Sequence, residues 1–175
     1  IGGGGGRAGN SSAQGNTAED QYSLVLGGNG GSGGDAGRIH INNQNTGAIT
    51  VAESGGHALL VQSIGGGGGQ AGLASNQASD NQADKDKNLL DSNGATGKKS
   101  IKMALGGKGG AGGHGGEINI DNAGEILSAS DTSAAILAQS IGGGGGVGGA
   151  AQTENNTKAQ VNVNLTLGGS GGKGS

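Results

Sequence analysis

QSIGGGGG stands at residues 62–69 and again at residues 139–146, and the chain opens on IGGGGG at residues 1–6. Five consecutive glycines ordinarily indicate a flexible linker, because glycine has the widest choice of backbone conformations. A linker, however, has no reason to recur behind the same Gln-Ser-Ile. The repetition predicts a fixed place in a repeated scaffold, where backbone packs against backbone.

The similarity extends well beyond this octapeptide. Gly47–Gly69 aligns without gaps on Gly124–Gly146, at an offset of 77 residues. Upstream, LGGNGGSGGDAGRIHINN from Leu26 matches LGGKGGAGGHGGEINIDN from Leu105, and a third copy opens with LGGSGGKGS at Leu167. A constant block thus runs from each Leu-Gly-Gly through the five glycines. The segments between the blocks differ in length and composition.

The repeats divide the chain into three units. The first covers residues 1–63, with a variable insertion at 7–22 and a constant block at 23–69 that overlaps the next unit. The second covers residues 64–140, with an insertion at 70–102 and a constant block at 103–146, and a partial third unit covers residues 141–175. Because the chain starts on the tail of one repeat and stops inside another, we expect a segment of a longer array.

The composition excludes several classes of protein. Of 175 residues, 46 are Gly and 30% are hydrophobic, and one Tyr is the only aromatic residue. So little apolar area cannot offset the chain entropy of one compact core, which favours a repeated structure with a thin core. The net charge of −3 and the scattered Lys and Arg residues provide no surface for nucleic acid. No apolar run approaches the roughly 20 residues that span a bilayer.

The constant block predicts short β-strands. In RIHIN and EINID the isoleucines at 39 and 41, and at 118 and 120, stand two residues apart and share one face. A second strand is expected at AITVA or EILSA, and a third at HALLVQSI or AAILAQSI, whose more continuous apolar run favours burial on both faces. Such strands, with polar turns between them, predict an all-β fold, a repetitive β-solenoid similar to a parallel β-helix. Only Ala83–Ser92 favours a helical turn or two.

A second period, of three residues, appears where the order Gly-Gly-x begins at Gly27 and again at Gly106. Three residues per turn match the extended polyglycine II or polyproline II helix, which has no internal hydrogen bonds. Two of its three edges would be bare backbone that neighbouring segments can approach, and the x side chains would line the third. A flexible linker is the alternative, and the five-glycine runs carry no side chain to show a register. The x residues are Asn29, Ser32, Asp35 and Arg38 in the first copy and Lys108, Ala111, His114 and Glu117 in the second.

No constellation of residues indicates catalysis, and we expect no enzyme. GGSGGDAGR, at residues 30–38, fits the start of a calcium-binding nonapeptide, but Gly37 stands at its apolar position and His114 replaces Asp35 in the second copy. A calcium-stabilised solenoid is therefore kept as an alternative, and otherwise no cofactor or metal is expected. His40 and His57 have no histidine counterpart in the other copy, and His40 is expected to point outward between two isoleucines.

Two other polar features stand out. Gln62-Ser63 and Gln139-Ser140 occupy equivalent positions, which predicts stacked amide and hydroxyl hydrogen bonds between repeats. The insertion at 70–102 is the longest and most charged, and it is our candidate for a loop that contacts a partner. Its charges alternate in sign, which is also typical of a solvated loop. The candidate residues are Asp80, Asp84, Lys85, Asp86, Lys87 and Asp91.

AILAQSIGGGGGVGG, preceded by LGGKGGAGGHGGEINIDNAGEI, resembles the glycine-rich repeats of large autotransporter passengers on Gram-negative outer membranes. The resemblance covers both constant blocks and the third LGG start. It implies an extracellular passenger domain at the bacterial cell surface, usually a right-handed β-solenoid, that is secreted through a C-terminal barrel and is often tied to adhesion or biofilm. Contact with the outer membrane would run through such a barrel, which this segment does not include. No catalytic residues of the family carry over, because such repeats are scaffold.

We therefore expect a structural and adhesive surface protein, a stiff scaffold or fibre that presents variable loops. Its expected partners are neighbouring repeats, copies of itself, and host, surface or matrix components, with no nucleic acid. The alternative from another class is a receptor-binding adhesin of phage-tail type, in which glycine helices form a sandwich and the loops between them read the host.

Overall fold

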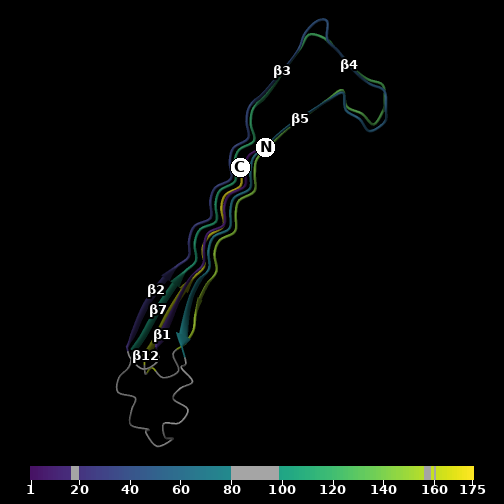
Figure 1. Ribbon diagram of the computed structural model, residues 1–175. Helices are drawn as coiled ribbons and strands as arrows, with labels where there is room; N and C mark the ends of the chain where they lie inside the picture. Colours follow the sequence, from purple (N-terminus) through teal and green to yellow (C-terminus); the bar gives the residue numbers. More distant parts are fainter. Residues whose placement is uncertain (17–19, 80–98, 156–158, 160) are drawn as a thin grey trace, which may run out of the picture.

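The computed structural model describes residues 1–16, 20–79, 99–155, 159 and 161–175. The chain runs up and down one long axis, so the molecule is far longer than it is wide (Figure 1). All regular structure in the described residues is β-strand, which confirms the expected all-β class. None of the described segments forms a helix that is long and apolar enough to cross a membrane.

One full turn of the chain ascends, crosses over and descends. The ascending leg holds β2 and β3, the crossing holds β4, and the descending leg holds β5 and β6, with glycine-rich segments between the strands of each leg (Figure 1). The strands of this turn are β2 (Gln21–Leu26), β3 (Ile39–Asn43), β4 (Ala48–Val51), β5 (Leu59–Ile64) and β6 (Ala74–Ser79).

The second turn follows the same path as the first. The chain begins in a descending leg that contains β1 (Ser11–Asn16) and ends in an ascending leg that contains β12 (Val161–Leu167). Between them, the second turn consists of β7 (Lys99–Leu105), β8 (Ile118–Asn122), β9 (Glu125–Ser128), β10 (Ile136–Ile141) and β11 (Ala151–Thr153).

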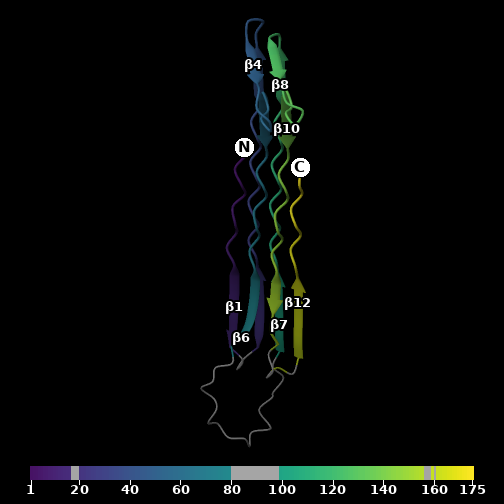
Figure 2. The same ribbon diagram turned by 90° about the vertical axis from the view of Figure 1, so that its right-hand side faces the viewer.

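Each strand pairs in parallel with the equivalent strand of the neighbouring turn, as the edge-on view shows (Figure 2). Gln62 lies opposite Gln139 and Ile39 opposite Ile118, so the sequence alignment between repeats also gives the register of the strands. Leu105 likewise pairs with Leu167 of the third copy. The five sheets have the strand orders β1-β6-β11, β10-β5, β12-β7-β2, β3-β8 and β4-β9.

The far end of the molecule, which comprises β3, β4, β5, β8, β9 and β10, follows the alternation of its sequence. Ile39 and Ile41 are partly buried between exposed polar neighbours, as expected. Burial of the third strand on both faces was a wrong expectation, because in β5 Val61 is 4% exposed whereas Leu60 is 53% exposed. Only one side of this strand faces the rest of the molecule, and its apolar residues therefore divide between the inside and the solvent.

The opposite end, which we call the base, consists of two three-stranded sheets, β1-β6-β11 and β12-β7-β2. Among the described residues, the buried apolar cluster between them consists of Val25, Ala74 and Ala104, with Ala13 and Ala151 packed against it. The segments 7–22, 70–102 and 147–164, which vary most between repeats, thus include strands that pair from turn to turn. Backbone hydrogen bonds make this pairing, so it leaves little trace in the sequence. Residues 83–92, where a helical turn was expected, lie outside the described residues.

Candidate functional site

The glycine-rich segments form a shaft between the base and the far end (Figure 1). The shaft comprises residues 1–10, 27–38, 65–73, 106–117, 142–150 and 168–175. Neighbouring segments of the ascending legs share a hydrogen bond at every third residue, with Gly30 N donating to the Lys108 carbonyl at 2.9 Å and Gly33 N to the Ala111 carbonyl at 2.8 Å. The ascending legs form one layer of the shaft and the descending legs form the other. The first glycine of each Gly-Gly-x triplet therefore donates its N–H to a neighbouring segment of its own layer.

The second glycine of each triplet binds the opposite layer. Gly66 N of a descending leg donates to the Gly34 carbonyl at 2.9 Å, and Gly113 N of the next ascending leg donates to the Gly66 carbonyl at 2.8 Å. Hydrogen bonds thus run both within and between the two layers. This pattern agrees with the expectation that two edges of each segment are bare backbone and the third carries the x residues.

Close contact, rather than special backbone dihedrals, explains the shaft glycines. Among the described residues, the glycine with a left-handed backbone is Gly55 (φ 81°), which lies in a far-end turn. A Cβ atom built on Gly66 would lie less than 3.0 Å from the Gly3 carbonyl oxygen, and one on Gly110 would meet the Gly31 carbonyl oxygen in the same way. Because these obstacles are backbone atoms, a neighbouring rotamer change cannot remove them.

The five-glycine runs have the same register, which the sequence alone could not show. A Cβ atom on Gly67 would have one neighbour within 4 Å, at 3.9 Å, and one on Gly144 would have none. Both glycines are exposed. Gly67 therefore occupies an x position between Ile64 and Gln70, and its lack of a side chain is not required by packing.

The x residues of successive turns form ladders along the exposed edge. Asn29 Oδ1 accepts a hydrogen bond from Lys108 N at 2.8 Å, and Asp35 Oδ1 accepts one from His114 N at 2.7 Å. These contacts satisfy backbone N–H groups that point away from both layers. Arg38 and Glu117 add an exposed ion pair at 3.0 Å.

The residues weighed for calcium binding do not converge in the part of the chain that the structure describes. Asp35 is used in the ladder, and His114 stands beside it in the next turn through its backbone N–H. The described residues contain no group of three or more His, Cys, Asp or Glu side chains that could hold a metal ion.

The other two histidines lie at the far end and also contact the next turn. His40 is exposed, as expected, and its Nε2 lies 3.6 Å from Asp121 Oδ2. His57 Nδ1 accepts a hydrogen bond from Ala134 N at 3.0 Å. Both side chains therefore contribute to stacking of the turns.

In the two Gln-Ser pairs, the glutamines and the serines make different kinds of hydrogen bond. Gln62 Nε2 donates to Gln139 Oε1 at 2.8 Å, which confirms the predicted amide ladder. The serine hydroxyls bond to the backbone of the opposite layer and not to each other, and one of the Ser63 bonds joins neighbouring repeats, as expected. Ser63 Oγ donates to the Gly37 carbonyl at 2.9 Å and accepts from Gly116 N at 3.0 Å, and Ser140 Oγ donates to the Gly116 carbonyl at 2.7 Å.

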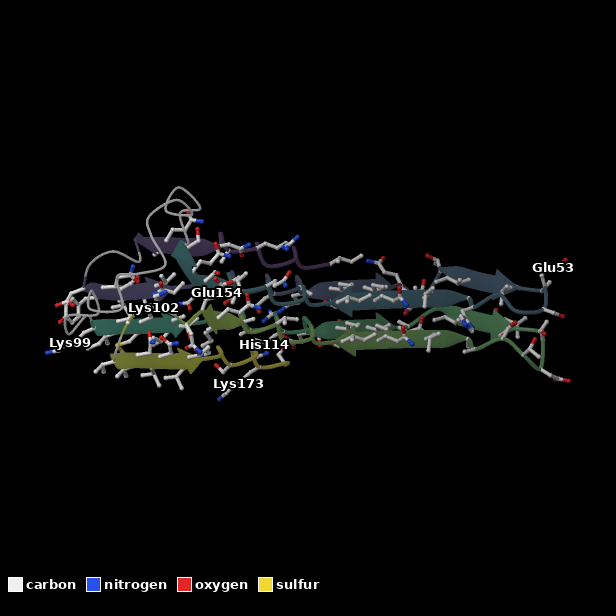
Figure 3. The ribbon with its side chains drawn as sticks, turned by 90° about the horizontal axis from the view of Figure 1, so that it is seen from below. Glu53, Lys99, Lys102, His114, Glu154 and Lys173 are labelled. Atoms are coloured by element: carbon white, nitrogen blue, oxygen red, sulfur yellow. The ribbon has the colours of Figure 1, made fainter. Side chains whose placement is uncertain are left out.

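A lysine is buried between the two sheets of the base. Lys102 has 0% exposure, and its Nζ donates to the backbone carbonyl of Glu154 at 3.1 Å (Figure 3). Burial lowers the pKa of this amine, because the charged form loses its hydration, and the Glu154 carboxylate offsets part of that effect. Two buried polar groups lie on strands of the same interior, Asn76 at 1% and Ser100 at 0% exposure.

The candidate contact residues Asp80, Asp84, Lys85, Asp86, Lys87 and Asp91 all lie outside the described residues. The segment that holds them connects β6 to β7, so it begins and ends at the base. Sequence reasoning missed two features of this end, the buried Lys102 and the apolar outer face of the sheet β12-β7-β2. The strict alternation in VNVNLTL and the partial alternation in QYSLVL were the available signals, but the boundaries of the repeats place parts of both strands in variable insertions.

Comparison with protein-family models, curated proteins and solved structures gives no match to this chain. Its function must therefore be argued from the repeat pattern and from the geometry above.

Proposed function

We propose that the chain is a flattened β-solenoid with a shaft of polyglycine II segments, and that it acts as a stiff extracellular scaffold that presents loops for adhesion. One observation carries this proposal: strands and glycine segments of one turn pair in parallel with the same segments of the next, at matching sequence positions. Such stacking is the defining property of solenoid proteins, in which each repeat contacts only its neighbours.

The hydrogen-bond pattern supports a stiff shaft. A polyglycine II segment has no internal hydrogen bonds, so an isolated one would be flexible in water. In this chain, Gly66 is tied to an ascending leg on each side, through its N–H to Gly34 and through its carbonyl to Gly113. Segments held on more than one edge cannot bend independently, which suits a spacer that keeps its two ends apart.

The position of the variable segments supports an adhesive role. The variable segments between β6 and β7 and between β11 and β12 start and end at the base, whereas the sequence of the shaft between base and far end repeats closely. Binding residues are commonly placed on loops that a rigid scaffold positions. The resemblance to autotransporter passengers supports the extracellular placement and the link to surface attachment.

The two-layer packing of glycine segments favours a second candidate, the phage-tail type of adhesin, because such a sandwich was its distinguishing expectation. Both candidates use a rod that carries loops, and they differ in what the rod is attached to. The neighbouring genes distinguish them, since an outer-membrane barrel encoded downstream in the same reading frame supports the first and tail genes support the second.

The direct test replaces the charged segment between β6 and β7 without altering the strands on either side of it. Substituting residues 81–97 by a short Gly-Ser linker keeps β6 and β7, whereas deletion of 70–102 would remove β6 and half of β7. We expect an unchanged thermal melt, because no described strand is altered, and a loss of retention on surfaces coated with matrix components.

The matched control for this test lies at the far end. Glu53→Gln removes one charge from an exposed turn there, and we expect it to leave retention unchanged (Figure 3). Full retention by the folded loop-replacement variant would contradict the assignment of binding to this loop.

A further inference from the structure

The outer face of the sheet β12-β7-β2 carries exposed Lys99 at one end of its central strand and is apolar across all three strands beyond it. Strand pairing places Tyr22 beside Ile101, Leu24 beside Met103 and Leu26 beside Leu105. The third strand completes the rows, because Val163, Leu165 and Leu167 pair with the same three residues of β7. Nine side chains, eight aliphatic or thioether-containing and one aromatic, thus form a three-by-three array, which we call the apolar array.

The array faces solvent, not the interior. Tyr22 is 67%, Leu24 60% and Leu165 41% exposed, whereas the alternate residues of the central strand, Ser100 and Lys102, are fully buried. The larger apolar side chains of this sheet therefore lie outside, unlike those of an ordinary β-sandwich, whereas its inner face combines Val25 and Ala104 with buried polar residues.

The other outer face of the base is polar. The apolar side chains of the array are therefore not a general property of the exposed sheet faces of this molecule. On the sheet β1-β6-β11, the exposed residues of the strands include Ser12, Gln14, Gln77 and Gln152. Both faces belong to three-stranded parallel sheets of the same molecule, so the contrast between them lies in their side chains.

We propose that the apolar array is a homotypic interface, where two copies of the chain pack face to face as a β-sandwich. Six of the nine array side chains are 41% to 67% exposed, and together they leave on the order of 500 Å² uncovered, the size of the largest patch on a typical monomer, which is often functional. Two such faces together bury roughly 1,000 Å², which reaches the lower limit of a specific protein interface. The proposal names a partner for the scaffold described above, but the contact itself does not depend on an adhesive role.

The chemistry of the array favours a second copy over other occupants. Within its nine residues, the phenol of Tyr22 is the only polar group, so a carbohydrate or a charged peptide would find few hydrogen-bond partners. A sheet whose outer face carries apolar rows matches another such sheet, since stacked sheets pack face to face about 10 Å apart with interdigitated side chains. Residues at the centre of a two-fold interface contact their own counterparts in the second copy. Met103 lies at the centre of the array, on its central strand, so we expect it to contact Met103 of the second copy.

Sedimentation velocity of the full chain, as a function of concentration, tests the proposal. We expect reversible dimers of the unaltered chain, and we expect Leu24→Lys with Leu165→Lys to raise the dimer dissociation constant at least about tenfold. The control is Gln14→Lys with Gln77→Lys, which adds the same charge to the polar face and should leave the dimer unchanged. At protein concentrations below the dimer dissociation constant, thermal melts of both variants should match the unaltered chain, because the altered side chains are exposed.

A chemical cross-link tests the geometry and does not depend on the lysine variants. The chain has no Cys, so Met103→Cys introduces one unique thiol. Facing sheets lie about 10 Å apart, beyond the roughly 7 Å limit of a disulfide between Cα atoms. A short bis-maleimide should therefore link Met103→Cys into covalent dimers, and it should leave Gln77→Cys monomeric.

Three results would overturn the proposal. The first is a monomer at every concentration up to about 1 mM, the weak limit of specific association. The second is equal loss of dimer in the control on the polar face. The third is flotation of the unaltered chain with neutral phosphatidylcholine vesicles without self-association, which would assign the array to lipid. Dimer formation that persists after the loop replacement would leave this interface supported even if the adhesive role failed.

Discussion

Single glycines of the shaft have one of two roles, which depend on their place in the triplet. Gly66 lies where two backbones touch, and its N–H and carbonyl both bond to the opposite layer. Gly67 is its immediate neighbour in the chain, yet a Cβ atom on it would have a single neighbour, at the ordinary contact distance of 3.9 Å. The same residue type is therefore required at one position and dispensable at the next.

Alanine substitutions at these two positions provide a matched pair. We expect Gly66→Ala to lower the free energy of unfolding by about 1–3 kcal/mol, because its Cβ collides with backbone that can only shift. We expect Gly67→Ala to be neutral or to stabilise by about 0.5 kcal/mol, because Ala narrows the freedom of the unfolded chain. Urea titration followed by circular dichroism measures both. Equal effects of the two changes would contradict the period-three register of the five-glycine run.

At the scale of elements, the base departs from the usual rule that a sheet faces its partner with apolar residues. The interior between its two sheets holds Lys102, Ser100 and Asn76, all at 1% exposure or less. Asn76 Oδ1 and Ser100 Oγ lack a hydrogen-bond partner among the described residues. Each such group costs about 1–3 kcal/mol when it is left unpaired, so this packing is not the most stable one available.

The charge of Lys102 makes the stability of the base depend on pH. In the unfolded chain this amine keeps its proton up to its ordinary pKa of 10.5, whereas in the fold the pKa is lowered. The unfolded state therefore binds more protons between the lowered pKa and 10.5, and stability rises with pH through that window. Below the window the cost of burying the charge is fully present.

Lys102→Met removes this charge and retains most of the side-chain volume. We expect the variant to be more stable than the unaltered chain at neutral pH by about 1–2 kcal/mol, because replacing a buried charge by an apolar group of similar size is often favourable. The difference should shrink as the pH approaches 10.5, the ordinary value for this amine. Urea titrations over this pH range measure it, with Lys108→Met, at an exposed x position, as the control. A constant difference at every pH would show that packing, not charge, separates the two proteins.

For the molecule as a whole, the repeated stretches predicted much of the fold. The alignment at an offset of 77 residues gives the pairing of Gln62 with Gln139, and the alternation around Ile39 gives the inward face of β3. Neither observation predicted that β1, β6 and β11 form a sheet at the base, because their side chains vary while their backbones pair. The candidate contact loop could be proposed from its charge, but its partner has no signature in the sequence.

The direction in which turns accumulate leads to the last prediction. Residues 64–140 start at the Ile that follows Gln-Ser and stop just before the next such Ile, so they cover one full turn of 77 residues. A second copy inserted after Ser140 continues the chain through Ser-Ile junctions that already occur in it. Because each strand pairs sideways with the next turn, the longest dimension should stay constant. The width should grow by about 4.8 Å, the spacing between paired strands.

Small-angle X-ray scattering of the duplicated chain measures both dimensions, and urea titration measures its stability. The added turn should raise both the free energy of unfolding and its dependence on urea, because every new segment gains a paired neighbour and buries more surface. A scrambled insert of the same length and composition, placed at the same point, should add neither ordered width nor stability. Growth of the longest dimension instead of the width would mean that turns join end to end, and it would contradict the sideways stacking on which the proposed scaffold rests.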